Sequence, residues 1–443
     1  MPPVAFKQRV IPVSTVRTVR RRLLGWYDVH RRDLPWRRRQ NDPYAQWVAE
    51  IMLQQTRVET VIPYYERFLK RFATLQRLAR APHEQVLKAW EGLGYYRRAL
   101  HLHQAAKVLV RRHADLPRSV GELRQLPGVG DYTAAAIASI AFGAREAAVD
   151  GNVARVLARL FGLKDGASIA RQRSSLRELA IQLLSPTRPG DFNQAWMDLG
   201  SAVCTPRDPD CPPCPLNRVC VFRRSGRSAL LPRTPKSTAK RLHWTLVTTV
   251  LCHDGLLLVR RRPRGGLWSG LWEFPTDLVA DENVDQGAEP RTFGDTKAWH
   301  HRGERGPREN GTDGPRDQGT KRRRNAGTDG RTGSRDDRAK RATVARTIIR
   351  RLAGRHGVTL HSAPRLLGSL AHELTHRSLT FLVYLAEVRE GRCTSTSTRR
   401  RSGPDRWLQR WVSTRDLKRL SLSTAQRRIH DMVRPALHRP PGR

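Results

Sequence analysis

The sequence predicts a multidomain protein in which an all-α domain precedes an α+β domain. Between residues 16 and 204, apolar residues recur at spacings of three and four with breaks at Pro or Gly, as in helices, and no run alternates with period two. From residue 243 onward β-rich runs take over, and the first two flank Asp254-Gly255, a hairpin signal. A chain of 443 residues is long enough for two or three domains, each with its own core.

The individual elements follow from the same patterns. In the first part of the chain we expect helices at residues 16–30, 43–55, 58–71, 83–91, 95–113, 119–124, 132–142, 152–161, 171–184 and 190–203. In the second part we expect strands at 243–252, 255–262 and 378–388, and helices at 342–356 and 424–433.

Composition sets the domain boundaries. We expect a basic arm (1–15), a helical domain (16–222), a Pro/Arg/Ser-rich linker (223–241), an α+β domain (242–436) and a tail (437–443). The second domain is interrupted at residues 281–340, where 14 Lys and Arg nearly balance 12 Asp and Glu and apolar residues are few. We expect this insert to be disordered, because it can bury too little apolar surface to offset the entropy of ordering.

The chain carries a formal net charge of +42, from 82 Lys and Arg against 40 Asp and Glu. Such a charge attracts polyanions, so nucleic acid is the leading candidate partner, although an Arg-rich genomic composition explains part of the excess. No stretch is long and apolar enough to span a membrane, and the amino terminus lacks a continuous apolar segment. We therefore expect a cytoplasmic protein, associated with the nucleoid if it is bacterial.

The stretch LPGVG at residues 126–130 predicts an anion-binding turn. Gly128 and Gly130 free the backbone from side chains while Pro127 stiffens the entry, so successive N–H groups can face an anion. A helix starting at Tyr132 adds the positive end of its dipole, and DNA phosphate suits so basic a chain. An ordinary turn between two helices is the simpler alternative.

Two carboxylates indicate bond-cleaving chemistry. Glu50 lies in the mostly apolar stretch WVAEIMLQQT, where loss of water would raise its pKa and keep it available as an acid. Asp150 precedes the helix expected at 152–161. Cleavage at the anomeric carbon of a sugar needs a proton for the leaving group and a negative charge beside the cationic centre, which this pair can supply. The alternatives are a glutamate on a solvated helix face and an ordinary N-cap.

The stretch GLGYY at residues 92–96 is an aromatic tip flanked by glycines. Such a tip can enter a base stack and hold the gap open, as base-flipping proteins do. The alternative is a helix-capping turn with buried aromatic rings.

Four of the six cysteines are clustered in the sequence: Cys204, Cys211, Cys214 and Cys220. They are separated by six, two and five residues, which favours a metal site over a disulfide framework. On spacing alone, structural zinc and a four-iron cluster both remain open.

Together these residues closely resemble the adenine DNA glycosylases of the MutY family, within the endonuclease III superfamily. The resemblance covers residues 20–222 and rests on the motifs LPWR, WVAEIMLQQTRV, GLGYY, LPGVGDYTA, VDGNVARV, FNQAWMDLG and the four cysteines. It implies a helix-hairpin-helix fold with a [4Fe-4S] cluster on those cysteines. It also implies that the partner is double-stranded DNA with an A:8-oxoguanine or A:G mispair, bound by a monomer.

The resemblance also implies roles for single residues. Glu50 would protonate adenine and Asp150 would stabilise the sugar cation or its covalent adduct, with Tyr132 and Asn152 placing these groups. The implied adenine pocket is Trp36, Arg32, Arg37 and Gln194; the residues implied around the opposite base are Gln54, Gln55, Thr56, Leu93 and Tyr95. Endonuclease III-like enzymes place a Schiff-base lysine at the position of Tyr132, so no efficient lyase step is expected here.

The second domain carries a resemblance of its own. GLWSGLWEFP and LSLSTAQRRI resemble the Nudix-like domain with which the family recognises 8-oxoguanine. No glutamate-rich Nudix box follows Pro275, so pyrophosphatase activity is not expected. The family's Phe-Ser-His loop appears as Leu374-Thr375-His376, which keeps a hydroxyl and a hydrogen-bond donor; an ordinary hydrophilic turn is the alternative.

The sequence thus predicts a monofunctional DNA glycosylase that hydrolyses the N-glycosidic bond of adenine mispaired with 8-oxoguanine or guanine. One alternative is a bifunctional glycosylase/lyase for oxidised pyrimidines, against which Tyr132 argues. The other is a non-catalytic DNA-binding module.

Overall fold

Two units make up the chain, residues 1–239 and 240–443. The computed structural model describes residues 10–40, 42–163, 173–226, 242–263, 265–279, 335–375, 377–389, 399–400 and 408–437. Most of the expected basic arm, linker, insert and tail lies outside these described residues.

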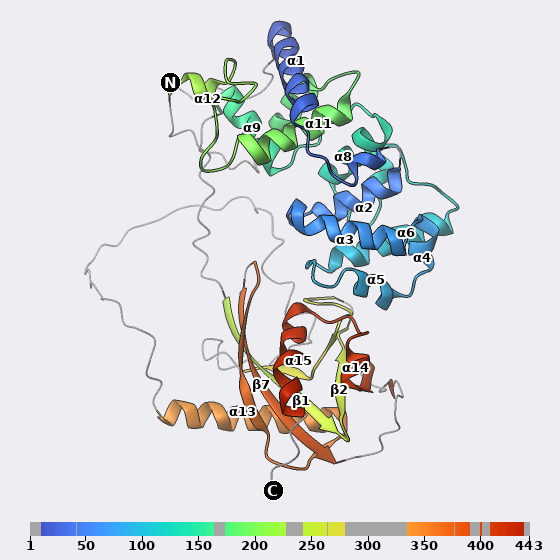
Figure 1. Cartoon of the computed structure of the whole chain (residues 1–443), viewed down its shortest axis with the longest axis vertical. Helices are drawn as coiled ribbons and strands as arrows, with labels where there is room; N and C mark the ends of the chain where they lie inside the picture. The colour runs from blue at the N-terminus through green and yellow to red at the C-terminus, as the bar shows by residue number, and fades with distance from the viewer. Residues whose placement is uncertain are drawn as a thin grey trace, which may run out of the picture. The chain divides into compact units, whose positions relative to one another are not determined.

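The first unit is helical, as predicted, and its described residues contain no strand (Figure 1). Its helices are α1 (Val13–His30), α2 (Pro43–Leu53), α3 (Val58–Arg71), α4 (Leu75–Arg80), α5 (His83–Ala89), α6 (Arg97–Arg111), α7 (Val120–Leu123), α8 (Asp131–Phe142), α9 (Gly151–Phe161), α10 (Arg173–Leu183), α11 (Pro189–Asp198) and α12 (Val221–Arg224), with the short turns η1 (Arg37–Arg39) and η2 (Leu199–Val203). Periodicity did not reveal α4, α12 or η1, because elements of six residues or fewer hardly complete two turns.

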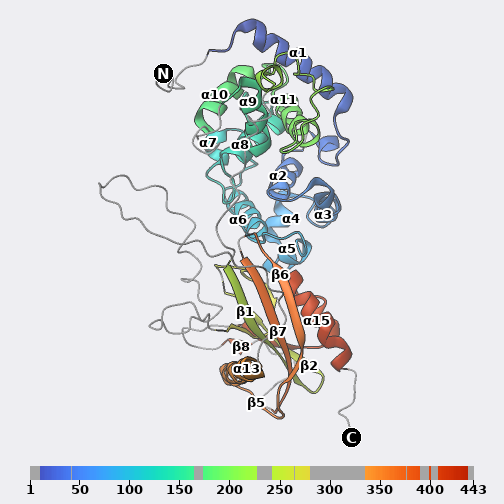
Figure 2. The same cartoon turned by 90° about the vertical axis from the view of Figure 1, so that its left-hand side faces the viewer.

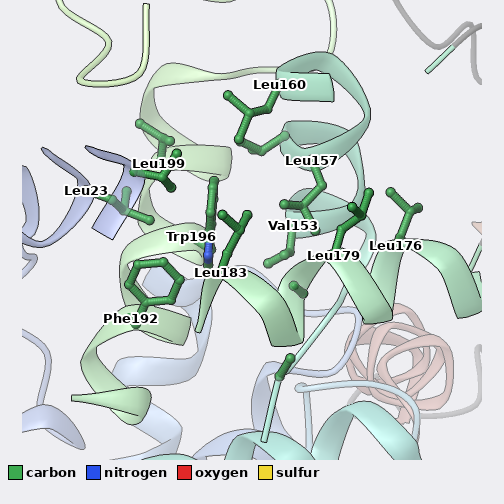
Figure 3. Close-up of a cluster of buried hydrophobic side chains, with 14 of the residues drawn as sticks. Leu23, Val153, Leu157, Leu160, Leu176, Leu179, Leu183, Phe192, Trp196 and Leu199 are labelled. Carbon is green, nitrogen blue, oxygen red and sulfur yellow. The ribbon is translucent and has the colours of Figure 1, made fainter. Parts of the chain in front are cut away.

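One large core cluster of this unit lies between α1, α9, α10 and α11 (Figure 3). Val153, Leu157 and Leu160 recur at spacings of four and three along α9, and each is at most 3% exposed. They pack with Leu23, Leu179, Phe192 and Trp196 from the other three helices. Because burial of each such side chain stabilises the fold by about 1.5–3 kcal/mol, the core holds α9 firmly, and with it Asp150 at its start.

Helices α2 and α8 pack directly on each other. Every residue of α2 from Ala45 to Met52 is buried, and α8 contributes the small buried side chains Ala134, Ala135, Ala136 and Ala138. Small residues let the two backbones approach closely. This contact brings the polar residues of α2 beside the start of α8.

The second unit is an α+β domain, as predicted. Its strands are β1 (Leu242–His253), β2 (Leu256–Arg261), β3 (Trp272–Glu273), β4 (Thr276–Leu278), β5 (Thr359–Leu360), β6 (Arg365–Glu373), β7 (Arg377–Arg389), β8 (Arg399–Arg400) and β9 (Leu408–Val412), and its helices are α13 (Arg335–His356), α14 (Thr414–Leu417) and α15 (Thr424–Leu437). The strand order is β5-β7-β1-β2-β9-β8, with β6 beside β7, β4 beside β1 and β3 beside β2.

The expected hairpin is present between β1 and β2. Cys252 pairs with Leu257, and Asp254 and Gly255 both have positive φ, 47° and 74°. Two successive residues of that kind define the turn that matches the twist of a hairpin, and glycine adopts it without a steric cost. The long strand β7 runs parallel to β1, with Leu242 opposite Arg377 at the first pair and Cys252 opposite Glu387 at the last.

The start of helix α13 differs from the predicted boundary between the insert and the helix that follows it. It begins at Arg335, seven residues before the predicted helix and within the segment expected to be disordered up to residue 340. Val247 of β1 and Tyr384 of β7 pack against α13, whereas α15 packs beside β6, and Figure 2 shows the two helices on either side of the sheet. In the part of the chain that is described, no helix has the length and apolar character needed to cross a membrane.

Candidate active site

Glu50 is a buried carboxyl group in the middle of α2. It is 5% exposed, and the hydroxyl of Tyr132 on α8 donates a hydrogen bond to its Oε2 atom at 3.4 Å. Burial, the largest effect, raises the pKa of Glu50 to about 7. The negative charge of Asp150 acts in the same direction, while the Tyr132 hydrogen bond and Arg37 act against it. A carboxyl with such a pKa can give up or accept a proton near neutral pH.

Asp150 is the N-cap of α9, as the simpler alternative predicted, and both of its oxygens are engaged. Oδ1 accepts from the backbone N–H of Val153 at 2.7 Å, and Oδ2 accepts from the Nδ2 amide of Asn152 at 3.1 Å. Arg155 in turn donates to the Oδ1 atom of Asn152 at 3.0 Å and to the carbonyl of Gly200 at 2.6 Å. Cap and candidate catalytic group are therefore the same residue, held in one orientation beside Glu50.

The expected pocket residues Arg32, Arg37 and Gln194 form one polar cluster. Arg37 donates to the Oε1 atom of Gln194 at 2.7 Å and to the Oδ2 atom of Asp198 at 2.7 Å. Arg32 donates twice to the other oxygen of Asp198, at 2.9 and 2.6 Å. Trp36, 4% exposed, lies edge-on to Tyr65 with ring centroids 5.5 Å apart.

Asp198 is the residue that sequence reasoning missed in this cluster. It is 1% exposed and binds both arginines. It lies four residues after Gln194 on α11 and so shares its helix face, and an aspartate in an apolar helix was a signal that could have found it.

The residues expected around an opposite base lie on two loops. Gln54, Gln55 and Thr56 follow the end of α2, and Gln54 donates to the Thr133 hydroxyl at 3.0 Å. In the second loop, Tyr95 is 46% exposed, whereas Leu93 is 5% exposed. The exposed aromatic side chain of this tip is therefore Tyr95, while Leu93 belongs to the protein interior in this structure.

The turn at residues 126–130 joins α7 to α8. Gly128 has φ +80°, and a Cβ there would lie 2.7 Å from the Cβ of His101, so only glycine fits. Gly130 immediately precedes α8, and a Cβ on it would meet nothing within 4 Å. The protein itself therefore does not require a glycine at 130, but a ligand approaching the amides at the start of α8 would.

The cysteines Cys204, Cys211, Cys214 and Cys220 line a single pocket. Arg159 extends into it and donates to the Cys204 Sγ atom at 3.1 Å and to the Thr205 carbonyl at 2.7 Å. Burial raises the pKa values of Cys211, Cys214 and Cys220. Among the residues described, no three His, Cys, Asp or Glu side chains are arranged to hold a single metal ion.

In the second unit, Thr375 is exposed at the tip of the hairpin between β6 and β7. The turn is closed by hydrogen bonds between the backbones of Leu374 and Arg377, at 2.8 and 3.4 Å. His376 lies outside the described residues.

The helical unit matches a known protein family. The family described as "HhH-GPD superfamily base excision DNA repair protein" matches residues 48–180, which contain Glu50, Tyr132 and Asp150. The helical unit is thus similar to the base excision DNA repair proteins that this family describes.

Relatives that match 57–60% of the chain specify the family. The chain is 42% identical over 317 residues to the adenine DNA glycosylase of Homo sapiens, covering 60% of this chain and 58% of that protein. It is 35% identical to that of Schizosaccharomyces pombe, covering 60% and 71%, and 34% identical to that of Buchnera aphidicola subsp. Baizongia pistaciae, covering 57% and 72%. The chain belongs to the adenine DNA glycosylase family. It spans 48–61% of the length of the rat, human and Arabidopsis thaliana members.

Proposed function

We propose that the chain is a monofunctional DNA glycosylase that hydrolyses the N-glycosidic bond of adenine mispaired with 8-oxoguanine or guanine in duplex DNA. The observation that carries this proposal is the buried carboxyl of Glu50, with a pKa of about 7, in the electrostatic field of Asp150. Glycoside cleavage requires one carboxyl that can give a proton and one that stays charged near the anomeric carbon. In this proposal the protein acts on DNA in the cytoplasm, as a monomer.

In the proposed reaction, Glu50 gives its proton to a ring nitrogen of the departing adenine. The bonding pair of the C1′–N bond leaves with the base, and positive charge develops on the deoxyribose. A water molecule then adds to C1′ and its proton passes to the Glu50 carboxylate, so that hydrolysis consumes one water and restores the acid. Tyr132 orients the acid through its hydrogen bond.

Asp150 is proposed to stabilise the sugar cation or its covalent adduct. Its carboxylate is held by the Val153 amide and by Asn152, so it needs little rearrangement as positive charge develops. Asn152 is therefore a positioning residue. The polar cluster of Arg32, Arg37 and Gln194, with Trp36, is proposed to receive the extruded adenine, because amide and guanidinium groups can bind its ring edge.

The absence of a lyase step is inferred from Tyr132. A strand-cleaving glycosylase needs an amine to form an imine with C1′, and the residue beside Glu50 is a phenol. Burial raises the pKa of Tyr132 well above its usual value, so it stays protonated and serves as a hydrogen-bond donor.

DNA contacts are proposed for two sites in the first unit and one in the second. The amides around Gly128 and Gly130 would bind phosphate at the start of α8. Gln54, Gln55, Thr56 and Tyr95 would surround the base opposite the adenine, with Tyr95 the exposed group able to enter the stack, and the buried Leu93 would support this loop from the interior. In the second unit, Thr375 and His376 are proposed to recognise 8-oxoguanine.

Cys204, Cys211, Cys214 and Cys220 are proposed to hold a [4Fe-4S] cluster. The residues suit this group, since four thiols line one pocket and Arg159 offers a positive charge and a donor to the sulfur of Cys204. When bound, the cluster would supply a covalent link that fixes the 204–220 loop. A brown colour with visible absorbance, lost in Cys214→Ser, is the expected result; a colourless protein that contains zinc would contradict it.

The function is tested with end-labelled duplexes that carry adenine opposite 8-oxoguanine, adenine opposite guanine, or an oxidised thymine. We expect strand breaks at adenine only after hot alkali, and none in Glu50→Gln. Breaks at oxidised thymine without alkali would establish the bifunctional alternative. Binding without any cleavage would establish the non-catalytic module.

A further inference from the structure

Arg98 is a buried cation that no step of the proposed reaction uses. It lies near the start of α6 and is 8% exposed. Burial lowers its pKa to about 10, so the guanidinium stays charged at neutral pH. A buried charge is stable only when it is paired or hydrogen-bonded, and among the described residues no carboxylate contacts Arg98. Its partners are oxygens at the end of α2 and in the two loops that follow α2 and α5.

One amino group of Arg98 binds the end of α2. Its Nη1 atom donates to the carbonyls of Ile51 at 3.2 Å, Met52 at 2.7 Å and Gln54. The last carbonyls of a helix have no partner within the helix, so Arg98 satisfies them and fixes where the chain leaves α2.

The other amino group binds Thr56, the residue after Gln55, and the second loop. Its Nη2 atom donates to the Thr56 hydroxyl at 2.9 Å and to the carbonyls of Leu93 and Gly94 at 3.4 and 3.2 Å. The guanidinium also lies over the ring of Tyr95, 5.4 Å from its centroid. One side chain thus joins two loops that are about forty residues apart in sequence.

Each loop has a residue with unfavourable backbone geometry directly at this junction. Gln55 has φ +57° and Tyr95 has φ +48°, in the left-handed region that side chains other than glycine rarely adopt. Such a conformation costs about 1–3 kcal/mol per residue and persists only where surrounding contacts enforce it. Both side chains are exposed. The strained backbone at these two residues therefore directs their side chains outward and does not serve to pack them into the core.

We propose that Arg98 is a positioning residue that sets the spacing and direction of Gln55 and Tyr95, and thereby the selectivity for the base opposite the adenine. This proposal rests on the proposed glycosylase function. Arg98 itself does not touch the DNA. It acts by holding both loops in their strained conformation before the duplex arrives, so that ordering them is not part of the binding step.

The test uses the full chain with Glu50→Gln, so that the DNA stays intact, and compares binding to a duplex with an A:8-oxoguanine mispair and to a fully paired duplex. We expect Arg98→Gln to lower the ratio of the two affinities by about tenfold or more while binding to the paired duplex changes little, since ångström-scale misplacement has effects of that size. Tyr95 entering the base stack should raise the fluorescence of a 2-aminopurine placed next to 8-oxoguanine. We expect this rise with the parent protein and not with Arg98→Gln.

Two further variants keep the proposal falsifiable if Arg98→Gln unfolds. Thr56→Val removes a single acceptor of Arg98 without changing the volume much and should lower the affinity ratio by a smaller factor, about threefold. The control Arg97→Gln removes the exposed neighbouring charge and should leave the ratio unchanged.

The outcomes separate the two proposals. An unchanged affinity ratio and unchanged 2-aminopurine signal in both Arg98→Gln and Thr56→Val would overturn the role of Arg98 alone. If the protein without Glu50→Gln also fails to excise adenine, and the parent shows no preference for the mispair, both proposals fall. Equal losses of affinity for both duplexes would mean that Arg98 contributes only to the stability of the fold or to the overall positive charge. That result would also overturn the proposal.

Discussion

Tyr132 donates a hydrogen bond of 3.4 Å to Glu50, across 82 positions of sequence. The bond joins α8 to α2 at the point where the two helices pack. Since the phenol binds the ionised carboxylate, it opposes the effect of burial, which raises the pKa of Glu50 to about 7. Burial thus raises the pKa of Glu50, and the Tyr132 hydrogen bond is the largest of the effects that oppose it.

This balance predicts the pH dependence of excision. Glu50 must be protonated to act as the acid, so the single-turnover rate should fall as the pH rises through about 7. Tyr132→Phe removes a contact that lowers the pKa, so the alkaline limb should move to higher pH. A pH–rate profile of both proteins measures this. If the alkaline limb of the Tyr132→Phe profile stays in place or moves to lower pH, the role assigned to Tyr132 is contradicted.

The same pKa predicts how stability depends on pH. Folding raises the pKa of Glu50 from 4.5 to about 7, so the folded state favours the protonated form and loses stability as the pH rises across that window. Glu50→Gln should therefore be more stable than the parent above about pH 7, by up to about 3 kcal/mol, and equal to it below about pH 4.5. Denaturant titration at several pH values measures the difference. The exposed Glu66→Gln is the control, and an equal change of stability with pH in that variant would refute the explanation.

Asp198 is predicted to hold the polar cluster together. Asp198→Asn removes the charge that pairs with Arg37, which is itself only 10% exposed, and should destabilise the protein by about 2–3 kcal/mol. Adenine excision should also fall, because Arg37 would no longer hold Gln194 in place. The control Asp33→Asn removes an exposed partner of Arg38 and should have no measurable effect on stability. Equal decreases in the melting temperature of Asp198→Asn and Asp33→Asn would contradict the role assigned to Asp198.

Gly200 is predicted to matter for catalysis through its contact with Asn152. A Cβ at position 200 would lie 2.9 Å from the Cβ of Asn152, so Gly200→Ala must displace the residue that binds Asp150. We expect single-turnover excision to fall by about tenfold or more, with a loss of stability of about 1–3 kcal/mol. Gly25→Ala, which meets nothing within 4 Å on α1, should be neutral or stabilising. Normal excision by Gly200→Ala would show that Asp150 does not depend on Asn152.

Local pattern was sufficient for the longer helices of the helical domain and for the β1–β2 hairpin. Repeats of three and four residues fix the buried side of helices such as α9, and Asp254-Gly255 fixes a turn type, because both effects act over a few neighbouring residues. Strand β6 was missed because exposed and half-buried positions dominate it and a register shift between Leu366 and Gly368 interrupts its alternation. The start of α13 was missed because its first residues are highly charged.

By itself, the sequence determined which residue types are available for chemistry: a glutamate in an apolar helix, an aspartate before a helix, four clustered cysteines and a glycine turn. The tertiary structure alone decided that Glu50 is buried against Tyr132, that Asp198 joins Arg32 to Arg37, and that Arg98 connects two loops. The physical reason is that a pKa and a hydrogen bond depend on distance and on loss of water. Both are set by helix packing between segments that are far apart in the chain.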